Sequence, residues 1–248
     1  MNYIRIFLIT ILIFNLSACF EKQDENTWVV GTSADNPPFE YMKNGKIVGF
    51  DVDLMIAIGQ HLGKNIEFKN MDFHGLLAAV STKNVDFVVA GLSITPERMV
   101  RVDFSVPYCD AKIALLVKAK DKINGPADLK GGIVGSQLGT IWSLINHDLG
   151  INYGFQPKTL ANNLILVEEL KSGRINAVIL EESQAKKFVK KNSLFHSFNV
   201  KQYASSFAIA MPKKSINKRN IDHTIKTLQK NGVINDLAKK WGISSASK

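Results

Sequence analysis

Residues 90–110, AGLSITPERMVRVDFSVPYCD, decide how the rest of the chain is interpreted. They follow an apolar run, Val85 to Ala90, that is typical of a buried strand. Gly91 allows the backbone to approach a small molecule closely, and Ser93 supplies a hydroxyl. Arg98 offers a planar set of donors that fits a carboxylate bidentately. The stretch therefore predicts an anion cradle; the alternative is a turn whose arginine pairs with a structural acid.

The same stretch resembles the signature of extracytoplasmic amino-acid-binding proteins of ABC importers, the solute-binding family 3 of histidine-, glutamine- and arginine-binding type. Those proteins carry a similar G-[LM]-[ST]-[IV]-T-x-x-R run, then VDFS and a Pro-Tyr or Tyr-Tyr pair. Here the run is residues 91–98, followed by VDFS at 102–105 and by Pro107-Tyr108. The resemblance covers nearly all of the chain after residue 27. It implies a periplasmic-binding-protein-like fold of type II, with two α/β lobes joined by two hinge strands and a ligand cleft between them.

The composition is that of a globular protein with a substantial core, since 46% of the 248 residues are hydrophobic. The formal net charge is +9, but the basic residues are scattered, apart from a run at 186–191 (KKFVKK) on an expected helix. We interpret that run as a solvated helix face and expect no nucleic-acid partner. No zinc-type Cys/His spacing and no G-x-G-x-x-G, P-loop, H-E-x-x-H or G-x-S-x-G sequence occurs. We therefore expect no metal and no cofactor.

The N-terminus has the pattern of an export signal. The apolar stretch from Ile6 to Phe14 is too short to cross a bilayer and has the length of a signal-peptide core. Leu-Ser-Ala-Cys at 16–19 resembles a bacterial lipobox. We therefore predict a signal peptide at 1–18, a lipidated Cys19 that begins a tether at 19–27, and a periplasmic or surface protein anchored to a bacterial membrane. An ordinary signal peptide without lipid is the alternative.

Strands alternate with helices along the chain, which predicts an α/β architecture. The resemblance implies that lobe 1 holds residues 28–109 and 207–248 and that lobe 2 holds 110–206. The two crossings then fall near Tyr108–Asp110 and Ser205–Phe207.

Local signals predict two helix starts. Asp51 or Asp53 is the simplest N-cap for the helix that follows Gly49-Phe50. Thr140 is a good N-cap for a second helix, expected to end at Gly150. Free N–H groups at such a helix start suit a carboxylate.

The resemblance implies how the carboxylate of an amino acid is held. Arg98, Ser93 and Gly91 of lobe 1 would act together with Gly139 and Thr140 of lobe 2. A second Thr or Ser often follows in the family, and its hydroxyl is missing here.

An acid is expected to bind the α-ammonium group. The apolar run 175–180 predicts a buried strand with Glu181 at its carboxyl end, where open α/β sheets bind ligands. The family usually has Asp there, so Glu181 keeps the charge and adds a methylene. Glu182 is the alternative if the register is shifted by one residue.

The ligand side chain is expected to meet Phe73, which the resemblance places in a stacking position, and the loop that carries Asp35, Asn36 and Phe39. The family often has an acid at the position of Ser33 and an aromatic at that of Asn36. Asp35 would suit arginine or lysine, whereas Asn36 and Ser33 would suit glutamine. The sequence leaves these two kinds of ligand open.

Together these features predict a monomeric lipoprotein that binds a polar or basic L-amino acid, closes about its hinge and delivers the ligand to an ABC transporter permease. We expect no enzymatic activity. The alternative is a periplasmic enzyme on the same fold, similar to cyclohexadienyl or arogenate dehydratase. In that case Glu181 would be the candidate general acid.

Overall fold

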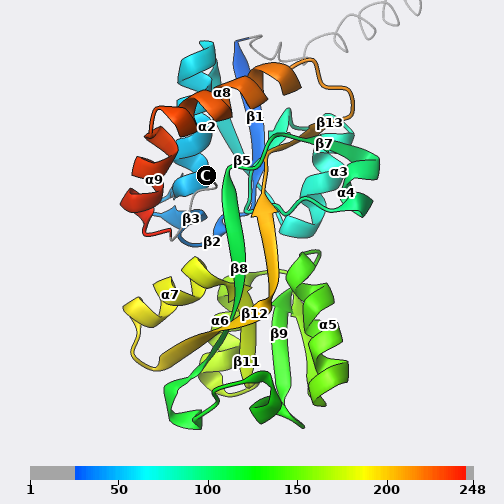
Figure 1. Ribbon diagram of the computed structural model, residues 1–248, viewed down its shortest axis with the longest axis vertical. Helices are drawn as coiled ribbons and strands as arrows, with labels where there is room; N and C mark the ends of the chain where they lie inside the picture. The colour runs from blue at the N-terminus through cyan, green and yellow to red at the C-terminus, as the bar shows by residue number, and fades with distance from the viewer. Residues whose placement is uncertain (1–25, 244–248) are drawn as a thin grey trace, which may run out of the picture.

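The computed structural model describes residues 26–243, and its two lobes are stacked along the long axis of the molecule (Figure 1). The predicted signal peptide and Cys19 lie outside the described residues. Within residues 26–243, no helix combines the length and the apolar character that crossing a bilayer requires.

The first lobe is built on a five-stranded sheet with the strand order β5-β1-β6-β13-β7. Strand β1 runs parallel to β5 and β6, whereas β13 runs antiparallel to β6 and β7. Its strands and helices are β1 (Thr27–Thr32), β2 (Asp35–Asn36), β3 (Glu40–Lys43), β4 (Lys46–Val48), α2 (Phe50–Leu62), β5 (Asn65–Asn70), α3 (Leu76–Ser81), β6 (Phe87–Val88), α4 (Pro96–Arg101), β7 (Val102–Phe104), β13 (Ala210–Pro212), α8 (Lys218–Lys230) and α9 (Val233–Trp241). Helices α2, α8 and α9 cover one side of the sheet, and α3 and α4 cover the other (Figure 1).

The second lobe has its own five-stranded sheet, with the order β10-β9-β11-β8-β12. Its strands and helices are β8 (Cys109–Lys118), β9 (Ile133–Gln137), α5 (Ile141–Tyr153), β10 (Gln156–Leu160), α6 (Asn163–Ser172), β11 (Ala177–Glu181), α7 (Glu182–Lys191) and β12 (Phe195–Phe207). Along β8, Ile113 and Leu115 pack in the same cluster as residues of α5, while Ala114 and Leu116 pack in the cluster of α6 and α7. The sheet is therefore buried on both faces, which explains its almost continuous apolar strands.

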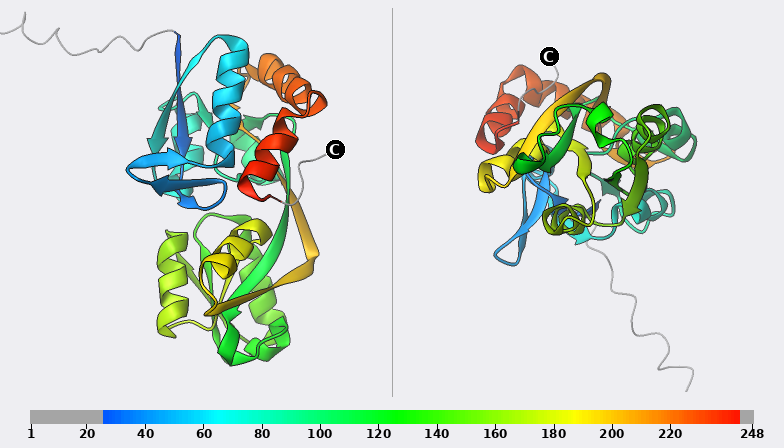
Figure 2. Two further views of the ribbon diagram at one scale, coloured as in Figure 1. Left: turned by 90° about the vertical axis from the view of Figure 1, so that its left-hand side faces the viewer. Right: turned by 90° about the horizontal axis from the view of Figure 1, so that it is seen from below.

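Strands β8 and β12 connect the lobes along one edge of the molecule (Figure 2, left). They pair antiparallel, and Phe207 lies opposite Cys109 at the end that reaches the first lobe. Phe207 also forms a bridge to Ser93 of that lobe. This pairing supports the division that we propose from the sequence, with lobe 1 at 28–109 and 207–248 and lobe 2 at 110–206.

Two local predictions need correction. Helix α2 begins after Gly49, which has no side-chain cap, and neither Asp51 nor Asp53 is the N-cap. Asp51 instead points into the lobe, and Asp53 accepts a hydrogen bond from the Trp241 indole at 2.7 Å. Helix α5 continues three residues past Gly150, because its left-handed terminating residue is Gly154.

Other local predictions are confirmed. The Thr140 side chain caps α5 by accepting a hydrogen bond from the Ser143 N–H. The lysines at 186, 187, 190 and 191 are exposed on α7, as expected of a solvated helix face.

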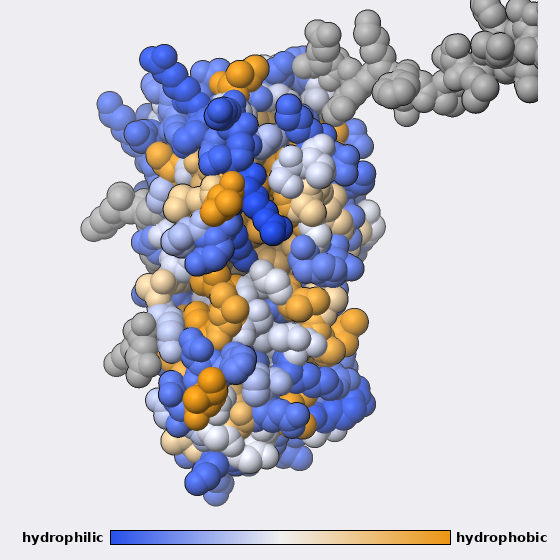
Figure 3. Space-filling view, turned by 90° about the vertical axis from the view of Figure 1, so that its right-hand side faces the viewer, coloured by the Kyte–Doolittle hydropathy of each residue, from blue (hydrophilic) through white to orange (hydrophobic). Residues whose placement is uncertain are grey.

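Hydrophilic and apolar side chains are unevenly distributed over the surface. On the face in Figure 3, hydrophilic side chains cover most of the outer ends, and apolar side chains are more frequent near the middle, where the lobes meet. The exposed apolar residues of the chain include Met99 and Val100 on α4 and Leu144 and Ile151 on α5.

We expect Gly49→Ala to destabilise lobe 1 strongly. Gly49 has φ 145°, and an added Cβ would lie 2.0 Å from the Phe39 carbonyl oxygen, so the backbone must move. Gly45→Ala is the matched control, because Gly45 also has a positive φ (75°) but no atom within 4 Å of the new Cβ. We expect a loss of about 1–2 kcal/mol in the free energy of unfolding for the control and a clearly larger loss for Gly49→Ala. Denaturant unfolding would measure both, and equal losses would contradict this account.

Candidate ligand-binding site

A narrow cavity is lined by residues of both lobes. Lobe 1 contributes its strand ends and the loops that follow them, and lobe 2 contributes the starts of α5, α6 and α7. The lining residues are Asn36, Phe73, Ala90, Gly91, Ser93, Arg98, Gln137, Thr140, Ile141, Trp142, Asn163, Glu181, Gln184 and Phe207. A cavity between the lobes is the expected place for a small ligand in this kind of fold.

Arg98 brings a buried positive charge to this cavity. Thr95 caps helix α4 and fixes the first turn, from which the Arg98 side chain extends. The guanidinium donates to the Ser93 carbonyl oxygen at 2.7 Å and to the Gly139 carbonyl oxygen, across the interface in lobe 2, at 3.0 Å. Burial lowers the pKa of Arg98 to about 10, so the group remains cationic at neutral pH.

Within residues 26–243, Arg98 forms no ion pair: its guanidinium donates to two carbonyl oxygens, and the neighbouring Glu97 acts on it only through its charge. A buried charge without a counter-charge is costly. A ligand carboxylate in the cavity would therefore be strongly stabilised. The same guanidinium lies 5.8 Å from the centre of the Phe73 ring, which closes one side of the site.

Glu181 brings a buried negative charge from lobe 2. It ends β11 and caps α7, since one carboxylate oxygen accepts the N–H groups of Ser183 at 2.6 Å and Gln184 at 3.1 Å. Burial raises its pKa to about 7, while these two backbone hydrogen bonds act in the opposite direction. Glu181 forms no ion pair within the described part of the chain. Its carboxylate therefore suits a cationic group of a ligand.

The register predicted at this position is supported by the neighbouring residue. Glu182 does not line the cavity; its carboxylate accepts hydrogen bonds from Lys186 at 2.6 Å and Asn199 at 2.8 Å. Of the two acids, only Glu181 is available to a molecule in the cavity.

The structure places most of the other predicted residues at the cavity. Gly91, Ser93, Thr140, Phe73 and Asn36 all line it. Their side chains or backbones come from both lobes, as the two-lobed arrangement requires.

Gly139 lies behind this lining and makes the contact between the lobes. It has φ 80°, and an added Cβ would lie 3.0 Å from the His74 Cβ of lobe 1. Its carbonyl oxygen accepts the hydrogen bond from Arg98. Gly139 therefore contributes through close approach of the two lobes, and Arg98 connects them there.

Phe39 is not a lining residue. It is fully buried in lobe 1, where its ring packs edge-on against Phe50 and Phe207. Its aromatic character therefore serves the core, and Phe207 is the ring of this group that reaches the cavity.

Asp35 is also placed differently from the prediction. Its carboxylate accepts hydrogen bonds across the interface from the Gln137 amide at 2.9 Å and the Asn163 N–H at 2.8 Å. The Asn163 amide in turn donates to the Gln137 side-chain oxygen at 2.9 Å. Burial raises the pKa of Asp35, and the hydrogen bonds lower it. Asp35 thus joins the two lobes beside the cavity and does not line it.

Sequence reasoning missed several lining residues, chiefly Gln137, Trp142, Asn163 and Gln184. A signal was present in the sequence, because Gln137 ends β9 and the other three lie in the first turns of α5, α6 and α7, which follow strand ends at the same edge of the sheet. Nothing in the local pattern shows which of these side chains turn toward the cavity.

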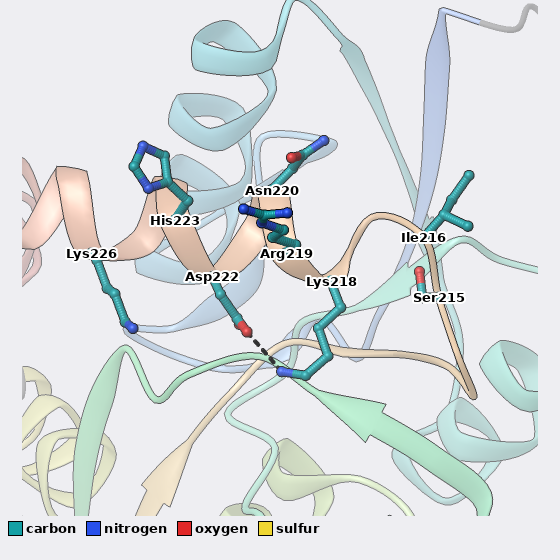
Figure 4. A pocket seen from close by; sticks show the side chains of 8 residues that line it. All are labelled: Ser215, Ile216, Lys218, Arg219, Asn220, Asp222, His223 and Lys226. Carbon is teal, nitrogen blue, oxygen red and sulfur yellow. Dashed lines mark hydrogen bonds and ion pairs between the residues drawn. The ribbon is translucent and has the colours of Figure 1, made fainter.

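A wider but open hollow lies on the outer surface of lobe 1, along α8 (Figure 4). Its basic residues include Arg219 and Lys226, and Lys218 points toward Asp222, with which it forms an ion pair at 2.8 Å. None of its lining residues lines the cavity between the lobes. We therefore assign the candidate site to the cavity between the lobes. Within residues 26–243, no group of His, Cys, Asp and Glu has the arrangement of a metal site.

Comparisons with known proteins agree with this geometry. Residues 28–244 match the family described as bacterial extracellular solute-binding proteins, family 3. The chain is similar to the arginine-binding extracellular protein ArtP of Bacillus subtilis (strain 168), with 36% identity over 236 residues that cover 92% of each chain.

Two solved structures are also similar. One is an ancestral arginine-binding protein bound to glutamine, with a TM-score of 0.82, 35% identity, and coverage of 90% of this chain and 100% of that one. The other is the ancestral amino-acid-binding protein AncCDT-1, a precursor of cyclohexadienyl dehydratase, with a TM-score of 0.79, 32% identity, and coverage of 87% and 95%.

The type II two-lobed α/β fold predicted from the sequence is thus confirmed, and the family match spans most of the chain. The chain belongs to the bacterial extracellular solute-binding proteins, family 3.

Proposed function

We propose that the protein binds a free amino acid with a basic or polar side chain between its lobes and delivers it to the permease of an ABC transporter. One observation carries the proposal. A buried cation, Arg98, and a buried acid, Glu181, line the same cavity from opposite lobes, and neither forms an ion pair within residues 26–243. An α-amino acid supplies both missing charges.

In this proposal the ligand carboxylate meets Arg98, assisted by the Ser93 hydroxyl. Gly91 and Thr140 line the cavity there, but the Gly91 N–H already donates to Asp51 and the Thr140 hydroxyl to the Gln137 carbonyl oxygen. The ligand ammonium group meets Glu181. Because the two charges come from different lobes, the ligand interacts with both only when the cleft is closed, and it shifts the population toward that state. The permease would then recognise the closed form.

For the side chain we propose arginine as the first candidate. The similar Bacillus protein is named as arginine-binding, whereas one similar structure of an ancestral arginine-binding protein holds glutamine. The aromatic rings of Phe73 and Trp142 line the cavity and could flank a guanidinium or a carboxamide. Calorimetric titration against the twenty amino acids would identify the ligand, and absence of binding to any of them would contradict the proposal.

An enzymatic function is the second candidate, and one observation favours it. Glu181 has a pKa raised to about 7 in a closed cavity, which suits a general acid. One similar protein is a precursor of a dehydratase. Incubation with prephenate or arogenate separates the two functions, since a binding protein gives no turnover.

We also propose that the mature protein is a monomer held at the membrane by lipid on Cys19. The Leu-Ser-Ala-Cys sequence at 16–19, after a short apolar run, supports this anchor.

Arg98→Ala should nearly abolish binding of every amino-acid ligand. Loss of one partner of a desolvated charge pair costs about 2–5 kcal/mol, or roughly 30-fold to several-thousand-fold in affinity. The affinity of Arg98→Lys should lie between those of wild type and Arg98→Ala, because lysine keeps the positive charge but lacks the planar guanidinium group. Arg101→Ala, at an exposed arginine of the same helix, is the control and should bind normally. Near-normal affinity of Arg98→Ala in calorimetry would move the carboxylate site elsewhere.

Glu181→Gln should lower affinity for any α-amino acid, while Glu181→Asp should weaken binding by only about tenfold, or about 1.4 kcal/mol, through a stretched contact. Glu182→Gln is the matched control.

The raised pKa of Glu181, about 7, allows a second test, the pH dependence of ligand affinity. Protonation of Glu181 removes the charge that the ammonium needs, so affinity should fall as the pH decreases through 7, by up to about tenfold per unit. Glu181→Gln should lack this pH dependence. If the affinity of the wild-type protein does not change between pH 5 and pH 8, the assignment is contradicted.

Cys19→Ala should release the protein from membranes, because the thiol is the site that lipid would modify. Membrane fractionation and incorporation of labelled fatty acid would measure this. Unchanged sedimentation together with unchanged labelling would exclude the lipobox interpretation.

A further inference from the structure

Two acidic side chains meet in the interior of lobe 1, directly behind the cavity. Glu40 begins β3, Asp51 lies in the first turn of α2, and both residues are completely buried. Each carboxyl group lies near enough to the other to affect its pKa. Within residues 26–243, neither forms an ion pair with a basic residue. Two adjacent carboxylates without a cation cannot both remain ionised in such surroundings.

The hydrogen bonds show how the charge is distributed. One oxygen of Asp51, Oδ2, accepts the Gly91 N–H at 2.7 Å and the Tyr108 hydroxyl at 2.8 Å. One oxygen of Glu40, Oε1, accepts the Asn36 amide at 3.0 Å. The other two oxygens, Glu40 Oε2 and Asp51 Oδ1, are shielded from water and have no donor when both groups are ionised. A single proton shared by the two carboxyl groups would supply the missing donor, because a protonated carboxyl donates and a carboxylate accepts.

We propose that Glu40 and Asp51 share one proton and act as a positioning pair that fixes the lobe 1 wall of the cavity through Asn36 and Gly91. Both of these residues line the cavity, whereas neither acid does. The fit is close, since a Cβ on Gly91 would lie 3.0 Å from the Asn36 amide nitrogen. The pair therefore acts on the ligand indirectly, by holding the Asn36 side chain and the Gly91 backbone in place.

We assign the proton to Glu40. The two donors that Asp51 accepts at 2.7 Å and 2.8 Å are those of an ionised carboxylate. Burial raises the pKa of Asp51 to about 6, and burial together with the nearby charge of Asp51 raises the pKa of Glu40 well above its usual value.

The surroundings oppose loss of the shared proton. Three ionisable groups interact electrostatically with the pair: Asp35, the Tyr108 hydroxyl and the Cys109 thiol. The pKa of Cys109 is raised by the charge of Glu181 as well. All of them are acids, so none offsets a second negative charge. In the unfolded chain both carboxyl groups lose their protons near their usual pKa values.

The consequence for stability has a definite sign. Between the unfolded and the folded pKa values, the folded protein binds more protons than the unfolded chain, so the free energy of unfolding falls as the pH rises. The fall begins above the ordinary carboxyl range and ends once the pH exceeds the folded pKa of Glu40. Above that pH, the second buried charge also releases Asn36 from its fixed position, and ligand affinity decreases.

Glu40→Gln tests the proposal because it is a neutral copy of the protonated acid. Its amide N–H can donate to Asp51 Oδ1, and its oxygen can still accept from Asn36. We expect it to bind amino acids within about threefold of wild type at neutral pH, and its melting temperature to fall less than that of wild type between pH 5 and pH 9. Glu40→Ala, which loses both hydrogen bonds, should bind at least about tenfold more weakly. Glu168→Gln, at an exposed acid of lobe 2, is the control and should follow wild type in both measurements.

Thermal unfolding without ligand makes this test independent of the proposed function. Affinities are compared between wild type and Glu40→Gln at each pH, so titration of the ligand's own groups affects both proteins equally. If Glu40→Gln shows the same pH slope in melting temperature as wild type, the shared proton is excluded. If it binds as weakly as Glu40→Ala, the positioning role is excluded. If Glu40→Ala fails to fold, the slope of Glu40→Gln still decides.

Discussion

The closed arrangement of this protein depends on one guanidinium group. Arg98 donates one hydrogen bond to Ser93 in its own lobe and another to Gly139 in the opposite lobe. A charged group that is removed from water needs such partners, yet carbonyl oxygens do not neutralise it. The structure thus keeps a positive charge at the meeting point of the lobes, and it keeps a negative one, Glu181, on the facing lobe. The cavity is defined by these two charges more than by its apolar walls.

The contacts around this point explain how the lobes recognise each other. Gly139 lies close against His74, which leaves no space for a side chain, and Asp35 connects to Gln137 and Asn163 at the side of the cavity. Each contact joins residues more than 60 positions apart in the chain. All of them break when the lobes separate, so they stabilise the closed state in addition to whatever a ligand contributes.

Lobe 1 carries its buried acids in a different manner from lobe 2. Glu181 has two backbone N–H partners, whereas Asp51 lies near another buried carboxyl group, Glu40, and each affects the pKa of the other. The first arrangement leaves a charge facing the cavity, and the second, in our proposal, keeps a single charge and a proton behind it. Asp51 also accepts a hydrogen bond from the hydroxyl of Tyr108, the residue just before β8. The same acid therefore connects the cavity wall with one of the two strands that cross between the lobes.

The sequence by itself determined the α/β class, the family, the cap at Thr140, and the charged residues that line the cavity. Those features depend on local patterns: apolar runs, capping residues, and charges that follow strand ends. Tertiary structure decided the rest. Asp35, Asn36 and Phe39 lie within five residues, yet one joins the lobes, one lines the cavity and one packs in the core. Asp51 has the spacing of a helix cap but faces Glu40. The direction of each side chain is set by elements that are distant in the chain and pack against it, and local spacing carries no information about those neighbours.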